Sequence, residues 1–206
     1  MYIIGITGGT GAGKSSAVKA LKTLGIQALD CDAVYHEMLT GDTEMAAEIK
    51  THFNGVSSDG TIDRQKLGDI VWNDPDALQK LNSITHEFIR KEIEKRIDSL
   101  KKHGAKTVAI DAIALIESGQ GKKCDIIIGV VASKEKRISR IMDRDDLTRE
   151  KARLRINAQQ PESFFRKHCD HILENQYDTP AEFESKCIKF FKEQLNPAIS
   201  GMAIHC

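Results

Sequence analysis

A glycine-rich stretch near the start of the chain carries its clearest chemical signal. Residues 8–15 read Gly-Gly-Thr-Gly-Ala-Gly-Lys-Ser and fit the spacing G-x-x-x-x-G-K-[ST]. Glycines at this spacing let backbone N–H groups close around phosphate oxygens. The alternative is a glycine-rich turn without a ligand, which would match the four fixed positions by chance in roughly one chain of this length in a hundred, or fewer. The stretch therefore predicts a site for nucleotide phosphates.

Roles follow for the residues of this loop and of the helix after it. The residues expected to bind the phosphates of ATP are Gly11, Ala12, Gly13, Lys14, Ser15 and Ser16. Lys14 is expected to reach the β- and γ-phosphates and to act in catalysis, and the Ser15 hydroxyl is expected to bind Mg²⁺. An apolar run at residues 2–6 predicts a strand before the loop, and residues 16–24 have helical spacing after it. Strand, loop and helix thus stand in the order that such a site needs.

Acidic residues follow two other predicted strands. Asp30 and Asp32 come after residues 27–29, and Asp111 ends the apolar run at residues 107–110. Open α/β sheets bind ligands at this carboxyl edge, where a carboxylate can take a proton from a substrate hydroxyl. If the first strand continues, its two aspartates point the same way; the alternative is that one of them caps the next helix. Asp111 is a candidate ligand of Mg²⁺, directly or through water, or else a turn residue.

Arginines gather in a helical region after residue 134. They are Arg137, Arg140, Arg144, Arg149, Arg153 and Arg155. Mixed charge of this kind usually marks a solvated helix face. Arginine, however, makes bidentate contacts with phosphate, and a predicted turn at residues 145–148 separates Arg144 from Arg149. We therefore predict a mobile lid whose arginines neutralise charge during phosphoryl transfer. Arg64 and His86, in the middle of the chain, are each either an anion contact or a surface residue, and their spacing does not decide.

The whole chain limits the class of protein. It has 206 residues, of which 40% are apolar, and 30 basic residues balance 30 acidic ones. This balance gives no global attraction to nucleic acid, and no basic block suits a membrane surface. No apolar run approaches the ~20 residues of a spanning helix, and we expect no leader segment before the first strand. Five scattered cysteines indicate reduced thiols. We expect a cytoplasmic globular protein that binds neither nucleic acid nor membrane.

Predicted strands and helices alternate along the chain, which indicates an α/β fold with a parallel sheet. The nucleotide-binding core is expected from residues 1–41, 104–144 and 169–206, with a loose tail from residue 197. Residues 42–103 are expected to form a helical substrate lobe, and residues 145–168 a lid. Within these parts, Asp63 is predicted to cap a helix that runs to residue 72, and residues 146–158 are predicted to be helical.

These motifs together resemble the dephospho-coenzyme A kinase family over nearly the whole chain, in the same order. Residues 3–15 resemble its phosphate loop, and Asp30-Cys31-Asp32 resembles its D-A-D. Further resemblances lie at residues 63–72, 81–86, 111–117, 144–150, 155–159 and 172–175. Glu87 and Ile113 stand where the family motifs have proline.

The resemblance implies a three-layer P-loop fold with a five-stranded parallel sheet, a helical lobe and a lid. It implies transfer of the γ-phosphoryl of ATP, with Mg²⁺, to the ribose 3′-hydroxyl of dephospho-CoA. Asp32 is implied as the base, Arg140 and Arg144 as catalytic residues, and Arg149 and Asn175 as ATP contacts. The implied acceptor contacts are Asp32, Arg64, His86, Asp111 and Ile113. The expected assembly is a monomer or a small homo-oligomer.

Two other interpretations remain open. One is a kinase for another nucleotide or small metabolite, since such kinases share the core and the lid. The other is a non-catalytic nucleotide-sensing module, which would keep the phosphate loop but need not keep Asp32 or the arginines. A GTPase is not favoured, because the chain has no N-K-x-D sequence. Release of ADP with and without dephospho-CoA separates these possibilities.

Overall fold

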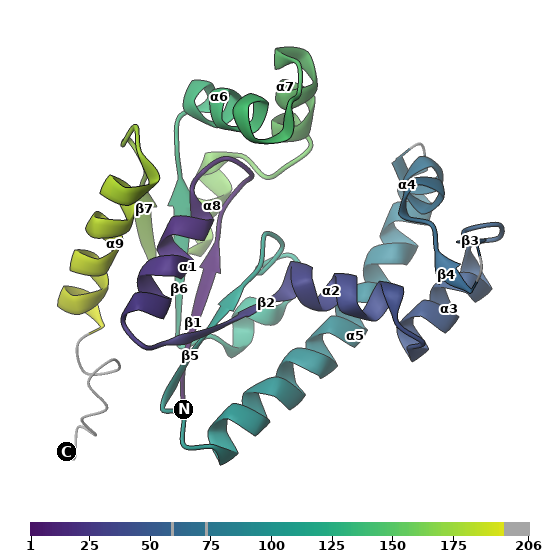
Figure 1. Ribbon diagram of the computed structural model, residues 1–206, viewed down its shortest axis with the longest axis horizontal. Helices are drawn as coiled ribbons and strands as arrows, with labels where there is room; N and C mark the ends of the chain where they lie inside the picture. The colour runs from purple at the N-terminus through teal and green to yellow at the C-terminus, as the bar shows by residue number, and fades with distance from the viewer. Residues whose placement is uncertain (59, 73, 196–206) are drawn as a thin grey trace. The chain divides into compact units, whose positions relative to one another are not determined.

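The computed structural model describes residues 1–58, 60–72 and 74–195 (Figure 1). The chain divides into two compact units. One consists of Met1–Leu29 with Leu100–Cys206, and the other of Asp30–Ser99. The tail expected from residue 197 lies outside the described residues. Among the described helices, none is long and apolar enough to cross a membrane.

A five-stranded sheet forms the centre of the first unit, in the order β2-β5-β1-β6-β7. Its strands are β1 (Tyr2–Thr7), β2 (Gln27–Asp30), β5 (Thr107–Asp111), β6 (Ile126–Val131) and β7 (His171–Glu174). β1 pairs in parallel with β5 and with β6, which places Ile6 opposite Asp111. The central strands are apolar and buried, as strands covered on both faces must be. The predicted α/β class with a parallel sheet is confirmed.

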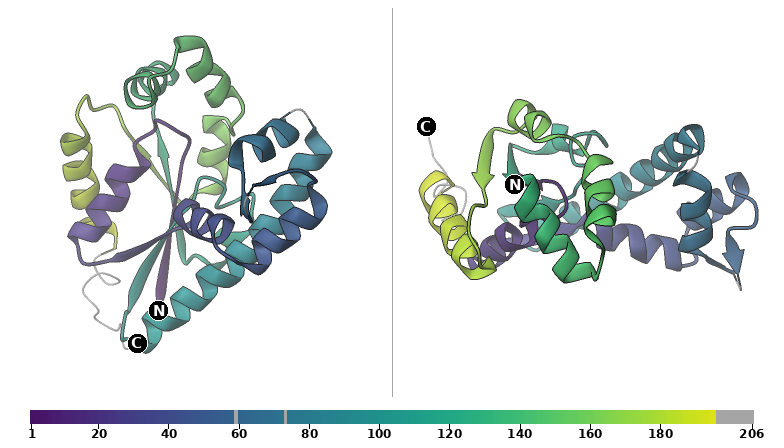
Figure 2. Two further views of the ribbon diagram at one scale, coloured as in Figure 1. Left: turned by 45° about the vertical axis from the view of Figure 1, so that its right-hand side comes forward. Right: turned by 90° about the horizontal axis from the view of Figure 1, so that it is seen from above.

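Helices cover both faces of this sheet. The helices of the first unit are α1 (Lys14–Thr23), the short 3₁₀ helix η1 (Gln120–Lys123), α6 (Lys134–Asp145), α7 (Arg149–Asn157), α8 (Glu162–His168) and α9 (Pro180–Gln194). α1 packs against α9, and the fully buried Phe183 and Phe191 of α9 join the apolar core of the sheet. α8 packs against β6 and β7. Figure 2 shows α1 and α9 on one side of the sheet and α8 on the other, so the first unit has three layers.

α6 and α7 form a two-helix arm with a small apolar core of its own. Its buried members are Ile138, Ile141, Ala152 and Ile156. α6 ends where Asp146 takes a left-handed conformation with φ 50°. The Thr148 hydroxyl then accepts a hydrogen bond from the Lys151 amide and caps α7. The prediction of a helix from residue 146 is therefore wrong at its start, because these two residues break the backbone there.

The second unit is mainly helical. It contains α2 (Cys31–Thr40), α3 (Glu44–His52), the strands β3 (Ser57–Ser58) and β4 (Thr61–Ile62), α4 (Arg64–Trp72) and most of α5 (Pro75–Lys102). Its core includes the fully buried Leu39, Met45 and Ile49. Asp63 caps α4 by accepting from the backbone N–H groups of the two residues after Arg64, as predicted. The unit thus has an apolar core of its own, as an independent substrate lobe requires.

Candidate active site

The phosphate-binding loop lies between β1 and α1, and its backbone conformation requires glycine at several positions. Gly8, Gly11 and Gly13 have φ values of 148°, 78° and 103°, which other residues rarely adopt. A Cβ on Gly8 would also lie 2.3 Å from the Val130 carbonyl oxygen. The loop leads into the N-terminus of α1 at Lys14, where the first backbone N–H groups have no partner inside the helix. Partial positive charge at this end suits an anion, as the motif predicts.

Lys14 and Asp111 meet beside this loop. The Lys14 ammonium donates a hydrogen bond to Asp111 Oδ1 and forms an ion pair with it. The two side chains are 15% and 11% exposed, so the pair is largely shielded from water. β5 carries Asp111 to this position because it runs beside β1. The lysine that was predicted to bind phosphate and the aspartate that was predicted to bind Mg²⁺ are therefore in direct contact.

A magnesium ion in this place would find hard oxygen ligands in Asp111 and in the Ser15 hydroxyl. Within the residues that the structure describes, no group of three or more His, Cys, Asp and Glu side chains is clustered for a metal. Mg²⁺ in nucleotide enzymes takes one or two protein oxygens and completes its octahedron with phosphate and water. The donor set present here fits that pattern.

The segment after β5 is hydrogen-bonded to the end of β1, the strand that precedes the phosphate-binding loop. The Thr7 hydroxyl donates to the Ile113 carbonyl oxygen at 2.9 Å. The half-buried Ile113 side chain lines a pocket of about 270 Å³. The other lining residues are Glu117, Ala158, Gln159, Gln160 and Phe165. The pocket therefore joins the end of β5 to the segment between α7 and α8.

Arg140 and Asn175 hold the backbone of the loop. Arg140 donates to the Gly11 carbonyl at 3.2 Å, to Asn175 Oδ1 at 3.2 Å and to the Tyr177 carbonyl at 2.7 Å. The buried Asn175 donates from Nδ2 to the Ala12 carbonyl at 2.9 Å. Burial lowers the pKa of Arg140 from its ordinary value. Asn175 was predicted to contact ATP and Arg140 to act in catalysis, and in this structure both contact the loop that would hold ATP.

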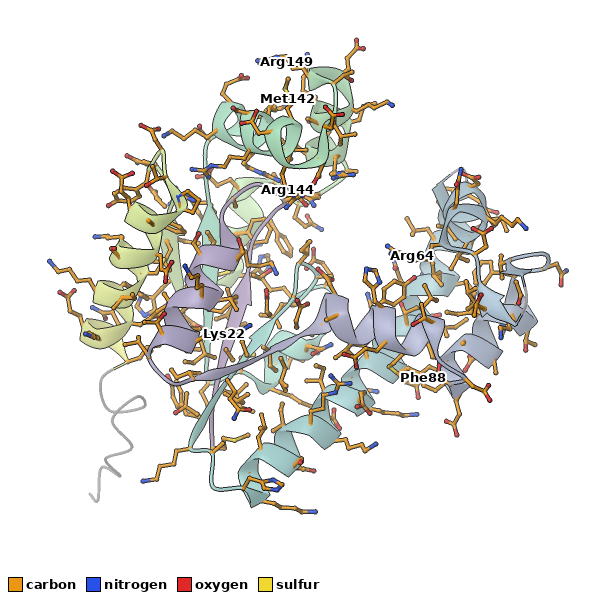
Figure 3. All side chains as sticks on the ribbon, in the orientation of Figure 1. Lys22, Arg64, Phe88, Met142, Arg144 and Arg149 are labelled. Carbon is orange, nitrogen blue, oxygen red and sulfur yellow. The ribbon has the colours of Figure 1, made fainter. Side chains whose placement is uncertain are left out.

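The outer arginines of the arm contact carboxylates. Arg144 donates to both Asp145 oxygens at 2.7 and 2.9 Å, and Arg155 also contacts Asp145. Arg149 pairs with Glu135. Figure 3 labels Arg144 and Arg149 on this arm. The Arg144 hydrogen bonds, followed by the charges of Arg144 and Arg155, lower the pKa of Asp145 to about 2.

Asp30 and Asp32, which both belong to the second unit, differ in their local structure. β2 ends at Asp30, and α2 begins at Cys31. Asp30 Oδ1 accepts from the backbone N–H groups of Asp32 and Ala33 at 2.9 and 3.0 Å, so Asp30 is the helix cap. The idea of a continuing strand with both carboxylates pointing one way is wrong, because the chain turns into a helix after Asp30. Asp32 lies in the first helical turn with an exposed side chain.

Arg64 and His86 both belong to this second unit. Arg64 opens α4 and is labelled in Figure 3. Burial raises the pKa of Tyr35, and the charge of Arg64 acts on that phenol in the opposite direction. His86 on α5 is half-buried, and burial lowers the pKa of its imidazole. His86 is therefore neutral at pH 7 and suited to hydrogen bonding rather than to charge pairing.

Two residues that the sequence did not connect with the loop also contact it. Arg137 and Gln159 both hydrogen-bond to Thr10. Arg137 was predicted to belong to the lid arginines, and it stands three residues before Arg140, so the two lie on one helix face. Gln159 belongs to the resemblance at residues 155–159, but that pattern does not indicate Thr10 as its partner, because the contact spans most of the chain.

A glycine loop between a parallel strand and a helix, an acidic residue on the adjacent strand and an arginine-bearing arm define a P-loop kinase. Comparison with known proteins narrows this class. The family model described as dephospho-CoA kinase matches residues 2–181, and the chain belongs to that family. A curated dephospho-CoA kinase from Lactobacillus acidophilus is 34% identical over 190 residues, covering 90% of this chain and 93% of that protein.

Solved structures agree with this assignment. A crystal structure from Thermus thermophilus superimposes with a TM-score of 0.81 at 30% identity, covering 94% of this chain and 97% of that chain. Dephospho-CoA kinase from Campylobacter jejuni gives a TM-score of 0.59 at 27% identity, covering 93% and 96%. The predicted family and the predicted kinase activity are confirmed. The chain is a phosphotransferase whose co-substrate is ATP.

Proposed function

We propose that the chain transfers the γ-phosphoryl group of ATP to the ribose 3′-hydroxyl of dephospho-CoA, giving ADP and coenzyme A. The observation that carries this proposal is the Lys14–Asp111 pair at the N-terminus of α1. It supplies both a cation for transferring phosphate and a carboxylate for its metal ion. We further propose a cytoplasmic monomer or small homo-oligomer without nucleic-acid or membrane partners.

In the proposed nucleotide complex, Lys14 exchanges its contact with Asp111 for the β- and γ-phosphates. Backbone N–H groups of Gly11, Gly13 and the first turn of α1 surround the phosphate oxygens. Asp111, directly or through water, and the Ser15 hydroxyl would hold Mg²⁺. The metal ion would supply positive charge that neutralises the charge developing on the phosphate groups. The shielding of the Lys14–Asp111 pair supports this role, because charges act more strongly where water is scarce.

Asp32 is the proposed general base. Its neighbour Asp30 is committed to capping α2, whereas the Asp32 carboxylate is exposed at the same end of that helix. A ribose hydroxyl is a poor nucleophile at neutral pH, and a positioned carboxylate can take its proton as the bond to phosphorus forms. The local structure thus favours Asp32 over Asp30, although both carry the same chemical group.

The remaining site residues are proposed to bind the acceptor or the phosphate groups of ATP. Arg64 and His86 bind the acceptor from the lobe at residues 42–103, and Ile113 contacts it from the segment after β5. Arg140, Arg144 and Arg149 neutralise phosphate charge as the lid at residues 145–168 closes. The carboxylate partners of Arg144 and Arg149 support exchange, since phosphate oxygens can replace carboxylate oxygens on a guanidinium.

The direct test measures ADP release from ATP and Mg²⁺, with dephospho-CoA, with a panel of nucleosides or without an acceptor. We expect rapid release only with dephospho-CoA, together with coenzyme A detected by mass spectrometry. Turnover with another acceptor alone would show a kinase of different substrate class. Nucleotide binding without any acceptor-dependent release would indicate a nucleotide-sensing module.

A paired substitution tests the base. Asp32→Asn keeps size and hydrogen bonding but removes charge, so turnover should fall ~10²-fold or more while both substrates still bind. Asp30→Asn is the matched control and should do less harm, because asparagine caps a helix as well as aspartate does. Normal turnover in Asp32→Asn with an inactive Asp30→Asn would mean that the other carboxylate is the base. If both variants were fully active, Asp111 would be the next candidate.

A further inference from the structure

Thr10, in the middle of the phosphate-binding loop, is held on both sides by two side chains from the arm. Its carbonyl oxygen accepts from Arg137 Nε at 2.9 Å, and its backbone N–H donates to Gln159 Oε1 at 2.9 Å. Gln159 Nε2 lies 2.6 Å from the Thr10 hydroxyl, and Arg137 Nη2 donates to Gln159 Oε1 at 2.8 Å. The three residues thus form a closed ring of hydrogen bonds, which we call the Thr10 clamp.

The clamp brings a buried positive charge to the loop. Arg137 is only 8% exposed, and the two oxygens that accept from it, on Thr10 and Gln159, are neutral. Burial lowers the pKa of Arg137, and the more distant charge of Glu162 acts in the opposite direction. No proton is lost at neutral pH, because guanidinium groups stay protonated in proteins. A positive charge with neutral partners therefore stands directly behind the loop.

Gly9 shows that the loop is fitted to this arginine. A Cβ on Gly9 would lie 2.3 Å from Arg137 Nη2 and 3.0 Å from Gln159 Oε1. The φ of Gly9 is not in the left-handed region, unlike those of Gly8, Gly11 and Gly13. A side chain at this position would therefore displace the Arg137 guanidinium from the clamp, although the backbone conformation of Gly9 is open to other residues.

We propose that Arg137 and Gln159 are positioning residues of this kinase, which fix the Thr10 peptide and thereby orient the loop for the triphosphate. The peptide bond after Thr10 is planar and trans, so its carbonyl and the Gly11 N–H point in opposite directions. Fixing the carbonyl on Arg137 turns the Gly11 N–H to the other side of the loop. The proposal rests on the proposed function only for its turnover measurements.

The clamp also ties the arm to the loop at two points. Arg137 belongs to α6, and Gln159 follows the end of α7. While the clamp is closed, only the part of the arm between Arg137 and Gln159 is free to move. Gln159 also lines the pocket beside Ile113, so a ligand in that pocket would contact a member of the clamp.

Two substitutions at Arg137 separate its charge from its geometry. Arg137→Lys keeps the charge but cannot reproduce the two-pronged contact, whereas Arg137→Met loses both. We expect Arg137→Lys to retain ATP affinity within a few-fold, measured by calorimetry without acceptor, and to lower kcat about 10- to 100-fold. Arg137→Met should weaken ATP binding as well. Arg166→Met, which removes an arginine paired with Glu162 and Glu174 at the surface, is the control and should change neither.

A merely structural role predicts a different result. In that case the Arg137 variants would melt earlier, but kcat and KM per folded molecule would equal those of the wild type, and the proposal would be overturned. If the wild type bound ATP but did not phosphorylate dephospho-CoA, the proposed function would fail. The clamp would then be judged by ATP affinity alone, which the same calorimetry provides.

A double-mutant cycle tests the Thr10–Gln159 contact itself. Thr10→Val removes the hydroxyl at constant shape, and Gln159→Leu removes all three hydrogen bonds of the amide side chain, including the one to the Thr10 hydroxyl. We expect the losses in kcat/KM for ATP to be less than additive in the double variant, because both changes break one contact. Strict additivity would overturn the clamp.

Discussion

Helix α6 carries arginines in two different kinds of surroundings. Arg137 and Arg140, nearer its start, are partly or fully buried and donate to neutral oxygens of the loop and its neighbours. Arg144, at its end, is 60% exposed and pairs with a carboxylate, as do Arg149 and Arg155 of α7. Residues of one type on one arm thus have different partners, and the partners indicate different tasks.

The buried inner arginines and the exposed outer arginines also differ in what their contacts contribute to stability. An exposed ion pair typically contributes ~0–1 kcal/mol, so its arginine can exchange a carboxylate for phosphate at little cost. Removing a buried hydrogen-bonding group leaves its partner unsatisfied, at a cost of ~1–3 kcal/mol. The inner arginines are therefore suited to hold the loop in place, and the outer ones to respond to a ligand.

The largest effect is expected within the loop itself. Lys14→Ala removes the charge that faces Asp111, and loss of one preorganised contact of this kind typically lowers the rate ~10²–10³-fold. Turnover should therefore be almost abolished while circular dichroism shows a folded protein. Lys19→Ala, which removes a largely exposed lysine of the same helix, is the matched control. Unchanged turnover in Lys14→Ala would refute the assignment of the loop.

The next effect concerns an inner arginine. Arg140→Met removes the hydrogen bonds to Gly11, Asn175 and Tyr177, and should lower kcat/KM for ATP about 10- to 100-fold. Steady-state kinetics at varied ATP measures the loss. Because the contact is to the loop, ATP affinity should fall in calorimetry even without acceptor. If Arg140→Met bound ATP with normal affinity in the absence of acceptor, Arg140 would act like the outer arginines, Arg144 and Arg149, instead.

A smaller and different effect is expected at an outer arginine. Arg144→Met should lower turnover by about tenfold, with little change in the affinity for dephospho-CoA, because the residue is expected to act only after the arm closes. Calorimetry with the acceptor and steady-state rates separate the two quantities. A loss confined to acceptor affinity would exclude the lid role for this residue. Hydrogen exchange should also show more protection of the arm when nucleotide is bound.

Much of the fold follows from local sequence patterns. The loop motif and the predicted strands that lead to Asp30 and Asp111 have the structure that the sequence predicts. Each of these signals depends on residues a few positions apart, where backbone geometry dominates. Confirmation of the family supports the predicted chemistry without testing the role of each residue.

The partners of the site residues could not be predicted in the same way. The Arg137–Thr10 contact joins residues 127 positions apart, and the helix pattern that contains Arg137 does not say which oxygen its side chain reaches. At Asp30 and Asp32 the sequence left open a continuing strand or a helix cap, and the structure shows that Asp30 caps α2, which begins at Cys31. At residues 145–148 the predicted turn is present, but the left-handed Asp146 and the Thr148 cap start α7 at Arg149 rather than at residue 146.

The smallest effect concerns the carboxylate that holds the outer arginines. Hydrogen bonds from Arg144, with the charges of Arg144 and Arg155, lower the pKa of Asp145 from its ordinary 3.8 to about 2. A depressed pKa means that the ionised form is favoured in the folded state, so its contribution to stability is present above about pH 4 and is lost as the pH falls towards 2. Asp145→Asn should therefore lower the free energy of unfolding slightly at pH 7, and this difference should disappear between pH 4 and pH 2.

Urea denaturation of both proteins across this pH range measures the difference at Asp145. High salt should shrink it at pH 7, because at 1 M ionic strength charges are screened beyond about 3 Å. A difference that persisted at pH 2 and in high salt would instead come from the shape of the turn between α6 and α7. The outer arginines would then be positioned by the backbone of that turn rather than by ion pairs that phosphate can replace. The distinction between the inner and the outer arginines would be lost.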